Sequence, residues 1–378
     1  MELLLRMDTM TNREKWRKYL AGEDVGPMVC PLCDKWGAGD IAYKWDGPEP
    51  EPFAGDEGRQ AFRGQLMMAR TFGWDPLFYA SIKFKPRDAS LEPAVTVSCK
   101  NGRRQAVSVI KTPPGDLTRV DEYSDVTHRC VKDYLETESD YEKMTWYTEQ
   151  ICDFDAEAAL EDGRRLRAAA SDHGMIGTWV SPSVSLADIQ VLFYHIMDYP
   201  EAFERLRLAR KKLMRRHLEV YRAAGFDFMF YCVPGTDTGS PCFYRNNMQE
   251  EIRETMAWWK SNGGFTLWHS CGHVRAFIEE GIYNETPPEM LETLSEPPVG
   301  NIPSLSWALE RLDPKIITKG NIPLDILLNG APEDVREAVR RVKSQARGRR
   351  HVIALSDNIL NGTPAANLRA YVDEGYRY

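Results

Sequence analysis

Long apolar runs are missing from this chain of 378 residues, although 43% of its residues are hydrophobic. No stretch approaches the roughly 18–20 apolar residues that a membrane-spanning helix needs. The N-terminal segment MELLLRMDTMTNREKW has a four-residue apolar patch but no signal-peptide core. The sequence therefore predicts neither a membrane protein nor a secreted one, while its apolar fraction is ample for a folded core.

Cysteine and positive charge are also in short supply. The eight cysteines are too sparse for a disulfide scaffold, so we expect reduced thiols and a cytoplasmic location. The 48 basic residues are outnumbered by 56 acidic ones, which gives a formal net charge of −8. Nucleic-acid-binding proteins usually carry a basic footprint. We therefore expect no nucleic acid and no membrane among the partners.

Several catalytic and cofactor motifs are absent too. No glycine-rich nucleotide fingerprint follows the first β-rich run, where an open doubly wound sheet would most often carry one. The sequence contains no nucleophile-elbow motif and no phosphate-binding loop. These absences remove the commonest nucleotide-binding and serine-hydrolase interpretations.

What the sequence does contain is an alternation of short β-rich runs with amphipathic helical segments. Such alternation is typical of parallel β–α units. We count eight runs, and eight units predict an α/β fold of the (β/α)8 TIM barrel type. An open doubly wound sheet is the alternative. The eight runs are 27–32, 77–84, 174–180, 226–231, 265–269, 290–294, 315–318 and 351–355.

Residues 85–150 differ in kind from the rest of the chain. Three segments there, 94–99, 105–111 and 117–123, are predicted to be antiparallel strands, with turns at Asn101-Gly102 and Pro113-Pro114-Gly115. We interpret this stretch as a β-rich insertion between the second and third units. The whole chain, 1–378, is then one barrel domain.

The chemistry of a β/α barrel takes place at the carboxyl ends of its strands. Polar side chains directly after the predicted strands are therefore the candidates for the site. The fifth run is followed by His269 and Cys271, and the eighth by Asp357. The remaining candidates follow the first, fourth, sixth and seventh runs: Cys30, Cys33, Cys232, Asp237, Glu296, Lys319 and Asn321.

His269 and Cys271 indicate a metal site, because imidazole nitrogen and thiolate sulfur are preferred zinc ligands. A catalytic zinc site has three protein ligands and one open position. Asp357 is the first candidate for the third ligand, and Cys232 or Asp237 the next. The alternative is that His269 is a buried core histidine and Cys271 a small apolar residue, because free cysteine is commonly buried.

From about Thr11 to Tyr378 the chain resembles the uroporphyrinogen decarboxylase superfamily. The phrase H-x-C-G at 269–272 carries the resemblance, together with K-G-N-I at 319–322 and G-T-P-x-x-N at 362–367. Longer matching segments are TNREKWRKYLAGE, MMARTFGWDPL, EPPVGNIPSLSWALERL and KIITKGNIPLDILLNGAPEDVREAVRRV. The resemblance implies a (β/α)8 barrel, in agreement with the count of runs.

The resemblance also separates two chemistries. True decarboxylases of the superfamily have an N-terminal motif whose arginines hold substrate carboxylates, and the equivalent segment here, MVCPLCDKWGAGD, contains no arginine. The cobamide-dependent methyltransferase branch has His-x-Cys and a later cysteine as zinc ligands. His269 and Cys271 match the first two positions, whereas the third falls on Asp357. A different third ligand, or loss of the metal, would also be consistent with this departure.

The methyltransferase branch implies zinc as cofactor and a cobamide carried by a partner, since this chain shows no recognisable cobamide-binding segment. We expect transfer of a methyl group from an aromatic methyl ether to a separate corrinoid protein. A coenzyme M type thiol methyltransferase and a cofactor-free decarboxylase are the alternatives. The expected catalytic residues are Asp357, Glu296 and Asp237, and the expected substrate-binding residues are Trp36, Trp179, Tyr231 and Asn321.

Overall fold

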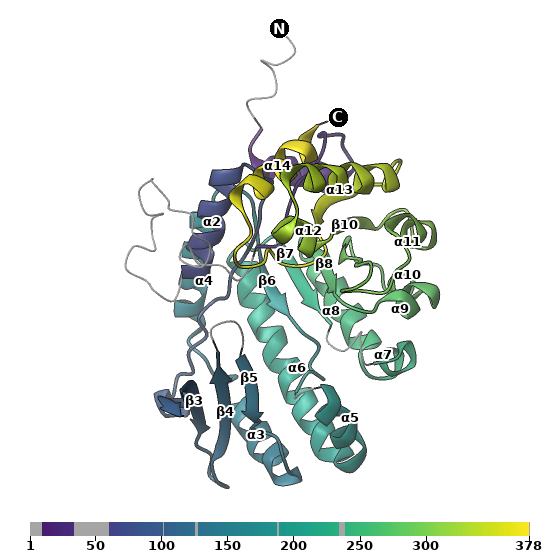
Figure 1. Ribbon diagram of the computed structural model, residues 1–378. Helices are drawn as coiled ribbons and strands as arrows, with labels where there is room; N and C mark the ends of the chain where they lie inside the picture. Colours follow the sequence, from purple (N-terminus) through teal and green to yellow (C-terminus); the bar gives the residue numbers. More distant parts are fainter. Residues whose placement is uncertain are drawn as a thin grey trace. The chain divides into compact units, whose positions relative to one another are not determined.

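The computed structural model describes residues 10–33, 60–100, 102–124, 128–186, 189–233 and 239–377 (Figure 1). The chain forms two compact units. Unit 1 consists of Met1–Ser81, Gly163–Ser181 and Ala224–Tyr378, and unit 2 consists of Ile82–Asp162 and Pro182–Ala223. The predicted insertion, 85–150, lies in unit 2.

A parallel sheet of seven strands organises unit 1. Its order is β1-β6-β7-β8-β9-β10-β11, so each strand pairs with the strand of this sheet that follows it in sequence. Such an order is produced by successive β–α units and confirms the predicted α/β class. The strands are β1 (Leu77–Tyr79), β6 (Met175–Val180), β7 (Phe228–Cys232), β8 (Phe265–Ser270), β9 (Met290–Thr293), β10 (Ile317–Ile322) and β11 (His351–Leu355).

The first predicted run, 27–32, forms isolated bridges instead of a regular strand. Val29 and Leu32 make parallel bridges to Ile353 and Asn358, beside β11. On the other side, the Asp75 amide donates a 2.8 Å hydrogen bond to the Val29 carbonyl, two residues before β1. The segment is thus hydrogen-bonded next to both edge strands of the sheet, which is compatible with a TIM-like barrel.

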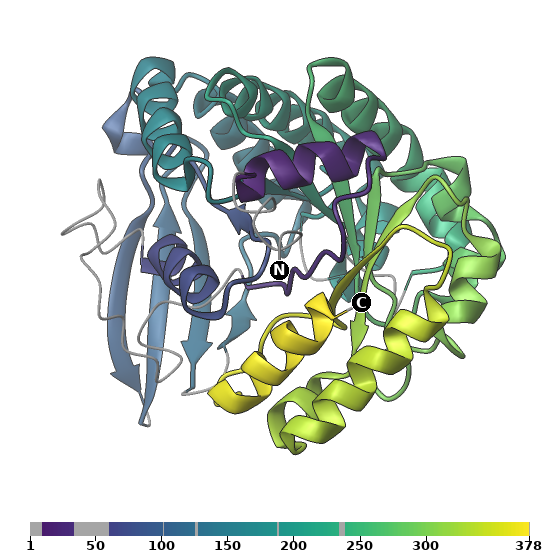
Figure 2. The same ribbon diagram turned by 90° about the horizontal axis from the view of Figure 1, so that it is seen from above.

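Two helices, α1 and α2, precede the first strand of unit 1, and the other helices of this unit lie between or after its strands. The first, α1, begins with a capping box, because the Thr11 and Glu14 side chains each accept from the other's backbone amide. Helices α13 and α14 pack side by side (Figure 2). The helices with residues in this unit are α1 (Asn12–Ala21), α2 (Gln60–Phe72), part of α4 (Ala156–Ala170), α7 (Pro241–Asn247), α8 (Gln249–Ser261), α9 (Arg275–Glu279), α10 (Ile282–Glu285), α11 (Leu305–Arg311), α12 (Leu324–Asn329), α13 (Pro332–Gln345) and α14 (Ala365–Tyr376).

The interior of unit 1 is built from alternate residues of the strands, as the pleat requires. One buried cluster joins side chains from every strand of the sheet with α1 and the bridging segment, and the described core members are almost all apolar. The strand members are Leu77, Tyr79, Met175, Phe228, Phe230, Phe265, Leu267, Met290, Ile317 and Val352.

Unit 2 contains a separate antiparallel sheet of four strands in the order β2-β3-β4-β5. The turn between β2 and β3 includes Gly102, whose φ of +75° favours glycine. Ile110, Leu117 and Tyr147 form a small core in this unit. Its elements are β2 (Ala94–Lys100), β3 (Arg103–Ile110), β4 (Leu117–Tyr123), β5 (His128–Lys132), the 3-10 helix η3 (Ala89–Leu91), α3 (Glu138–Gln150), α5 (Ile189–Asp198), α6 (Pro200–Ala223) and part of α4.

Two further predicted strands differ from the observed ones by more than two residues at one end. The run 77–84 yields only Leu77–Tyr79, and the run 315–318 is replaced by Ile317–Ile322. The second change matters for the site, because Lys319 and Asn321 lie within β10 and not after it. Among the described residues, no helix is long and apolar enough to cross a membrane.

Candidate metal centre

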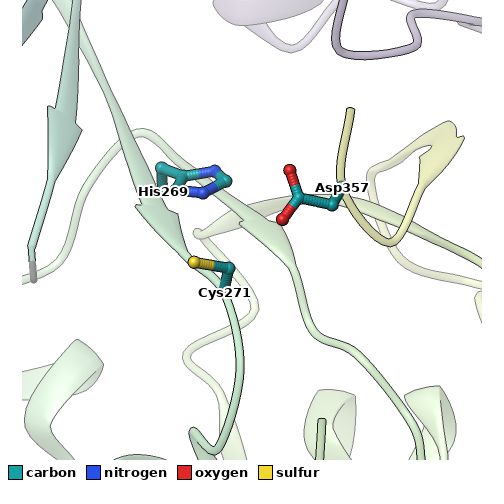
Figure 3. A group of neighbouring side chains, drawn as sticks. All are labelled: His269, Cys271 and Asp357. Carbon is teal, nitrogen blue, oxygen red and sulfur yellow. The ribbon is translucent and has the colours of Figure 1, made fainter. Parts of the chain in front are cut away.

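The side chains of His269, Cys271 and Asp357 converge in unit 1, as the sequence predicts. One potential ligand atom from each lies within 4.8 Å of the other two (Figure 3). His269 is buried, whereas Cys271 and Asp357 are half-buried. The three donors are therefore close enough to share one ion, and two of them remain accessible to a further ligand.

Strand geometry explains why these residues meet. His269 is the penultimate residue of β8, and Cys271 directly follows that strand. Gly272, with φ of +79°, turns the chain away immediately afterwards. Asp357 lies just beyond the end of β11. Because parallel strands share the direction of their carboxyl ends, segments distant in sequence deliver their side chains to the same end of the sheet.

Glu292, which the sequence did not single out, fixes the orientation of His269. Its Oε1 lies 2.6 Å from His269 Nδ1, and Glu292 is only 1% exposed. An ionised carboxylate only accepts hydrogen bonds, so Nδ1 carries the proton. In a neutral imidazole the other nitrogen, Nε2, then has the lone pair that a metal needs.

Lys319 completes a buried line of polar side chains. Its Nζ donates a 2.5 Å hydrogen bond to Glu292 Oε2, and the lysine is 1% exposed. His269, Glu292 and Lys319 are register partners on the adjacent strands β8, β9 and β10. The sequence identified Lys319 only as a polar residue near a strand end.

These contacts shift the ionisation of all three groups. Burial lowers the pKa of His269, but its hydrogen bonds to Cys271 and Glu292 outweigh burial and raise the pKa to about 10. Burial raises the pKa of Glu292, yet the Lys319 charge and the His269 hydrogen bond hold it below its ordinary value. Burial lowers the pKa of Lys319, but the Glu292 charge outweighs burial and raises this pKa above its ordinary value. Glu292 and Lys319 are therefore an ion pair.

Aromatic rings lie beside His269 on the interior face of the sheet. The ring centroids of Phe230 and Trp179 are 5.0 and 6.2 Å from that of His269. Trp179 and Phe230 are 4.2 Å apart, and Tyr79 lies 5.0 Å from Phe230. Trp179, predicted to bind substrate, is only partly buried. Its ring therefore lies beside His269 and is partly exposed.

Other predicted residues lie near the centre but outside the group of three donors. Cys232 ends β7 in register with His269 and is half-buried. Asn321 is 1% exposed, and its side-chain amide donates to the Leu294 carbonyl at 3.0 Å. Its Oδ1 has no hydrogen-bond partner among the described residues. Glu296 is held by Arg341 of α13, whose Nη1 lies 3.0 Å from Glu296 Oε2.

Tyr231 lies away from the donors. It is fully buried and has Glu251 and Tyr244 as electrostatic neighbours, on the side of the sheet that faces α7 and α8. Since neighbouring residues of a strand point to opposite faces, Tyr231 cannot share the interior face with Phe230 and Cys232. The structure thus does not bring Tyr231 together with the centre. Trp36 and Asp237 lie outside the described residues.

Comparison with known proteins identifies the family and the fold of the chain. Residues 134–378 match the family described as "Uroporphyrinogen decarboxylase (URO-D)". Two curated uroporphyrinogen decarboxylases of Prochlorococcus marinus, from strains NATL1A and MIT 9303, are 33% and 35% identical to this chain over 81 residues. Each alignment covers 20% of this chain and 23% of the relative. The chain thus spans less than a quarter of the length of the curated relatives it matches.

A solved structure matches over nearly the whole chain. It is described as a methyltransferase from Methanosarcina mazei, with a TM-score of 0.62 and 14% sequence identity. The superposition covers 97% of this chain and 98% of the other. At this identity the likeness establishes a common fold.

Proposed function

The chain belongs to the uroporphyrinogen decarboxylase family. Within this family, we propose that it is a zinc-dependent methyltransferase. It moves a methyl group from a small donor to the cobalt of a separate corrinoid protein. The donor that we propose is an aromatic methyl ether, so that the reaction is an O-demethylation. We also infer that the sheet of unit 1 closes as an eight-stranded barrel through segment 27–32, which is hydrogen-bonded beside β11 and before β1.

One observation carries this proposal: three donors of different types meet at the end of a parallel sheet. A nitrogen, a sulfur and an oxygen donor suit zinc, and three protein ligands are the number found in catalytic zinc sites. Zinc held by His269, Cys271 and Asp357 would supply Lewis-acid chemistry to the oxygen of a bound methyl ether. The half-buried Cys271 and Asp357 leave room for that oxygen.

The surrounding residues support an aromatic donor. Trp179 and Phe230 lie against one another beside His269 and offer ring faces and edges to a planar substrate. The buried Asn321 Oδ1, which has no partner among the described residues, is an acceptor for a phenolic hydroxyl group. The fold shared with the Methanosarcina mazei methyltransferase adds support for methyl transfer as the reaction class.

Decarboxylation is a second candidate, because the curated relatives that match 81 residues are named uroporphyrinogen decarboxylases. Against it, segment 28–40 contains no arginine to hold substrate carboxylates. The two candidates also differ in their need for the His269–Cys271–Asp357 group, since the decarboxylase alternative requires no metal.

The test is catechol formation from 2-methoxyphenol by the zinc-loaded chain, with a reduced corrinoid protein as methyl acceptor. We expect methylation of the corrinoid, and we expect His269→Ala to abolish both zinc content and transfer. Cys99→Ser, at an exposed cysteine in unit 2, is the matched control and should retain both.

Three results would contradict the proposal in different ways. Normal transfer by the metal-free chain would exclude the zinc mechanism. Transfer only to coenzyme M from methylcobalamin would assign the chain to the thiol methyltransferases. Release of carbon dioxide from uroporphyrinogen without added metal would favour decarboxylation.

A further inference from the structure

The four-stranded sheet of unit 2 has two edge strands, β2 and β5, and one of them is protected. Strand β5, HRCVK, carries Lys132 and also Arg129, whose Nη2 lies 2.8 Å from Glu122 Oε2 of β4. The register of β4 and β5 also shifts within their pairing. Charged side chains and bulges are the usual means by which an edge strand avoids pairing with another chain.

The opposite edge strand, β2, lacks this protection. Its first six residues, AVTVSC, contain no charge and include valine and threonine, which favour strands. Val95 and Val97 are 61% and 53% exposed. They lie on the same face of the sheet, and their register partners on β3, Ser108 and Ala106, are too small to cover them. Strand β2 therefore presents two apolar side chains at an open edge.

The backbone of β2 is open at this edge too. Lys100 and Arg103 are register partners with two residues between them, so they form the closely spaced hydrogen-bonded pair that closes a hairpin. Because such pairs alternate, the amides and carbonyls of the even-numbered residues of β2 point toward β3, whereas those of Val95 and Val97 point away from it. Among the described residues, neither valine makes a backbone hydrogen bond outside this sheet. Strand β2 can therefore accept one more strand.

We propose that this strand is β2 of a second copy of the chain, paired antiparallel about a two-fold axis at Thr96. In this register Val95 of each copy lies opposite Val97 of the other. The outward amides and carbonyls of both valines then hydrogen-bond across the interface. The four valines form one apolar cluster on the same face, so the exposed edge is complementary to itself, as a two-fold interface requires.

The charges at the two ends of β2 favour a second copy as the occupant. Asp88 and Glu92, the nearest charged residues before the strand, are exposed, and so are Arg103 and Arg104, which follow it. An antiparallel pair brings the acidic end of each copy toward the basic end of the other. Pro93 has no amide hydrogen and limits the pairing on that side. This interface goes beyond the proposed function and does not depend on it.

The experiment measures the mass of the full chain by analytical ultracentrifugation at increasing chain concentration. We expect the wild type to shift from monomer toward dimer. Val97→Pro should stay monomeric, because it removes an outward amide and leaves the hydrogen bonds to β3 in place. Val97→Lys should also stay monomeric, because the two copies then bring like charges together beside the axis. Circular dichroism verifies that both variants are folded.

Val131→Lys is the matched control. It places the same charge on the other edge strand, β5, at a valine that is 50% exposed. This variant should dimerise as the wild type does. A loss of the dimer in Val131→Lys equal to that in Val97→Lys would overturn the proposal, because added charge on either edge would then have the same effect.

Cysteine cross-linking tests the register. In a chain whose exposed cysteines are replaced by serine, Thr96→Cys should form a disulfide-linked dimer on mild oxidation, because residues opposite each other at a pair without hydrogen bonds have Cα atoms about 4.5 Å apart. Ser98→Cys should not, since its two copies are four residues out of register and about 13 Å apart. The exposed cysteines are Cys99, Cys130 and Cys242.

The other results would overturn the proposal. A wild-type chain that stays monomeric at every concentration would exclude a dimer, and one that instead binds a different protein through β2 would assign the edge to that partner. A dimer that survives both substitutions of Val97 would use another surface. Cross-linking through Ser98→Cys and not through Thr96→Cys would exclude the two-fold axis at Thr96.

Discussion

Asp357 supplies a carboxylate where the methyltransferase branch that this chain resembles has a cysteine. The structure brings this carboxylate within 4.8 Å of the His269 and Cys271 donors, so the substitution leaves the group of three intact. A carboxylate oxygen is a harder ligand than a thiolate and suits a metal that must accept an ether oxygen. The residue that departs from the pattern therefore changes the type of the third donor and does not remove it.

Replacing this carboxylate with a thiolate should change the ligand set without destroying it. We expect Asp357→Cys to bind zinc at least as tightly as the wild type, because thiolate is the softer ligand that zinc accepts readily. With Co²⁺ in place of zinc, the variant should show a stronger sulfur-to-cobalt charge-transfer band. An unchanged spectrum would mean that residue 357 does not touch the metal. Cys99→Ser, with an exposed thiol in unit 2, is the control.

At the scale of elements, the pairing of β10 with β11 contains a half-buried histidine. His351 Nε2 donates to the Gly320 carbonyl at 2.8 Å, and its Nδ1 accepts from the Thr318 hydroxyl at 2.8 Å. Burial lowers the pKa of His351 to about 4 and the Lys319 charge lowers it too, although the Gly320 hydrogen bond opposes this shift. The neutral ring is thus the form that joins the two strands.

The sign of the pH dependence follows from this lowered pKa. The unfolded chain takes up a proton near pH 6.5 and the folded chain only near pH 4, so stability is full above pH 6.5 and is lost as the pH falls toward 4. The full loss of stability is at most about 3.4 kcal/mol, since each pKa unit corresponds to 1.36 kcal/mol. Urea unfolding of the metal-free chain between pH 4 and 7 measures it. His351→Gln should show a shallower slope, and an unchanged slope would assign the acid sensitivity to other groups.

The contact between β6 and β7 requires a residue without a side chain at position 177. Gly177 and Phe228 are register partners, and a Cβ on residue 177 would lie 2.4 Å from the Phe228 ring. We expect Gly177→Ala to destabilise unit 1 by about 1–3 kcal/mol, as overpacking usually does. Adding Phe228→Leu should recover part of the loss in thermal melting. Additive effects of the two substitutions would mean that the residues do not compete for the same space.

Elements with regular apolar patterns were predictable from the sequence, and those shaped by the site or by an edge were not. The run HVIAL gave β11 with correct bounds, because a buried parallel strand is nearly continuously apolar. In contrast, β10 has the sequence ITKGNI, and its polar Lys319 and Asn321 hid the strand because they interrupt the apolar pattern that marks a buried strand. Strand β5, HRCVK, is polar at the edge of the small sheet and was missed.

The centre itself was predictable as far as its donors. His269, Cys271 and Asp357 follow strand ends, and strand ends of a parallel sheet converge. Glu292 was missed because it lies within β9 and contacts its partners through tertiary pairing, which no local spacing reveals. Tyr231 was predicted to lie at the centre, but its strand neighbours Phe230 and Cys232 face the interior of the sheet. Tyr231 therefore faces the opposite side, and the sequence alone did not show which alternate residues of this strand face inward.

At the scale of the molecule, a metal shared by β8 and the segment after β11 would join distant parts of unit 1. Binding to the folded chain alone should raise stability by about 2.7 kcal/mol at a zinc concentration 100 times the Kd. Calorimetry should show a higher melting temperature with zinc, reversed by a chelator. His269→Ala should lose the shift. A shift that persists in this variant would place the stabilising zinc elsewhere.

The line of His269, Glu292 and Lys319 has a consequence for how the sheet is assembled. The three residues are partners on neighbouring strands, so their charges are balanced in only one alignment of β8, β9 and β10. A slip of β9 by one residue would turn Glu292 to the other face and leave Lys319 buried without its counter-ion. Apolar neighbours such as Met290 and Leu267 would tolerate a slip of two residues far better. The same buried charges thereby raise the free energy of misaligned strands while the fold forms.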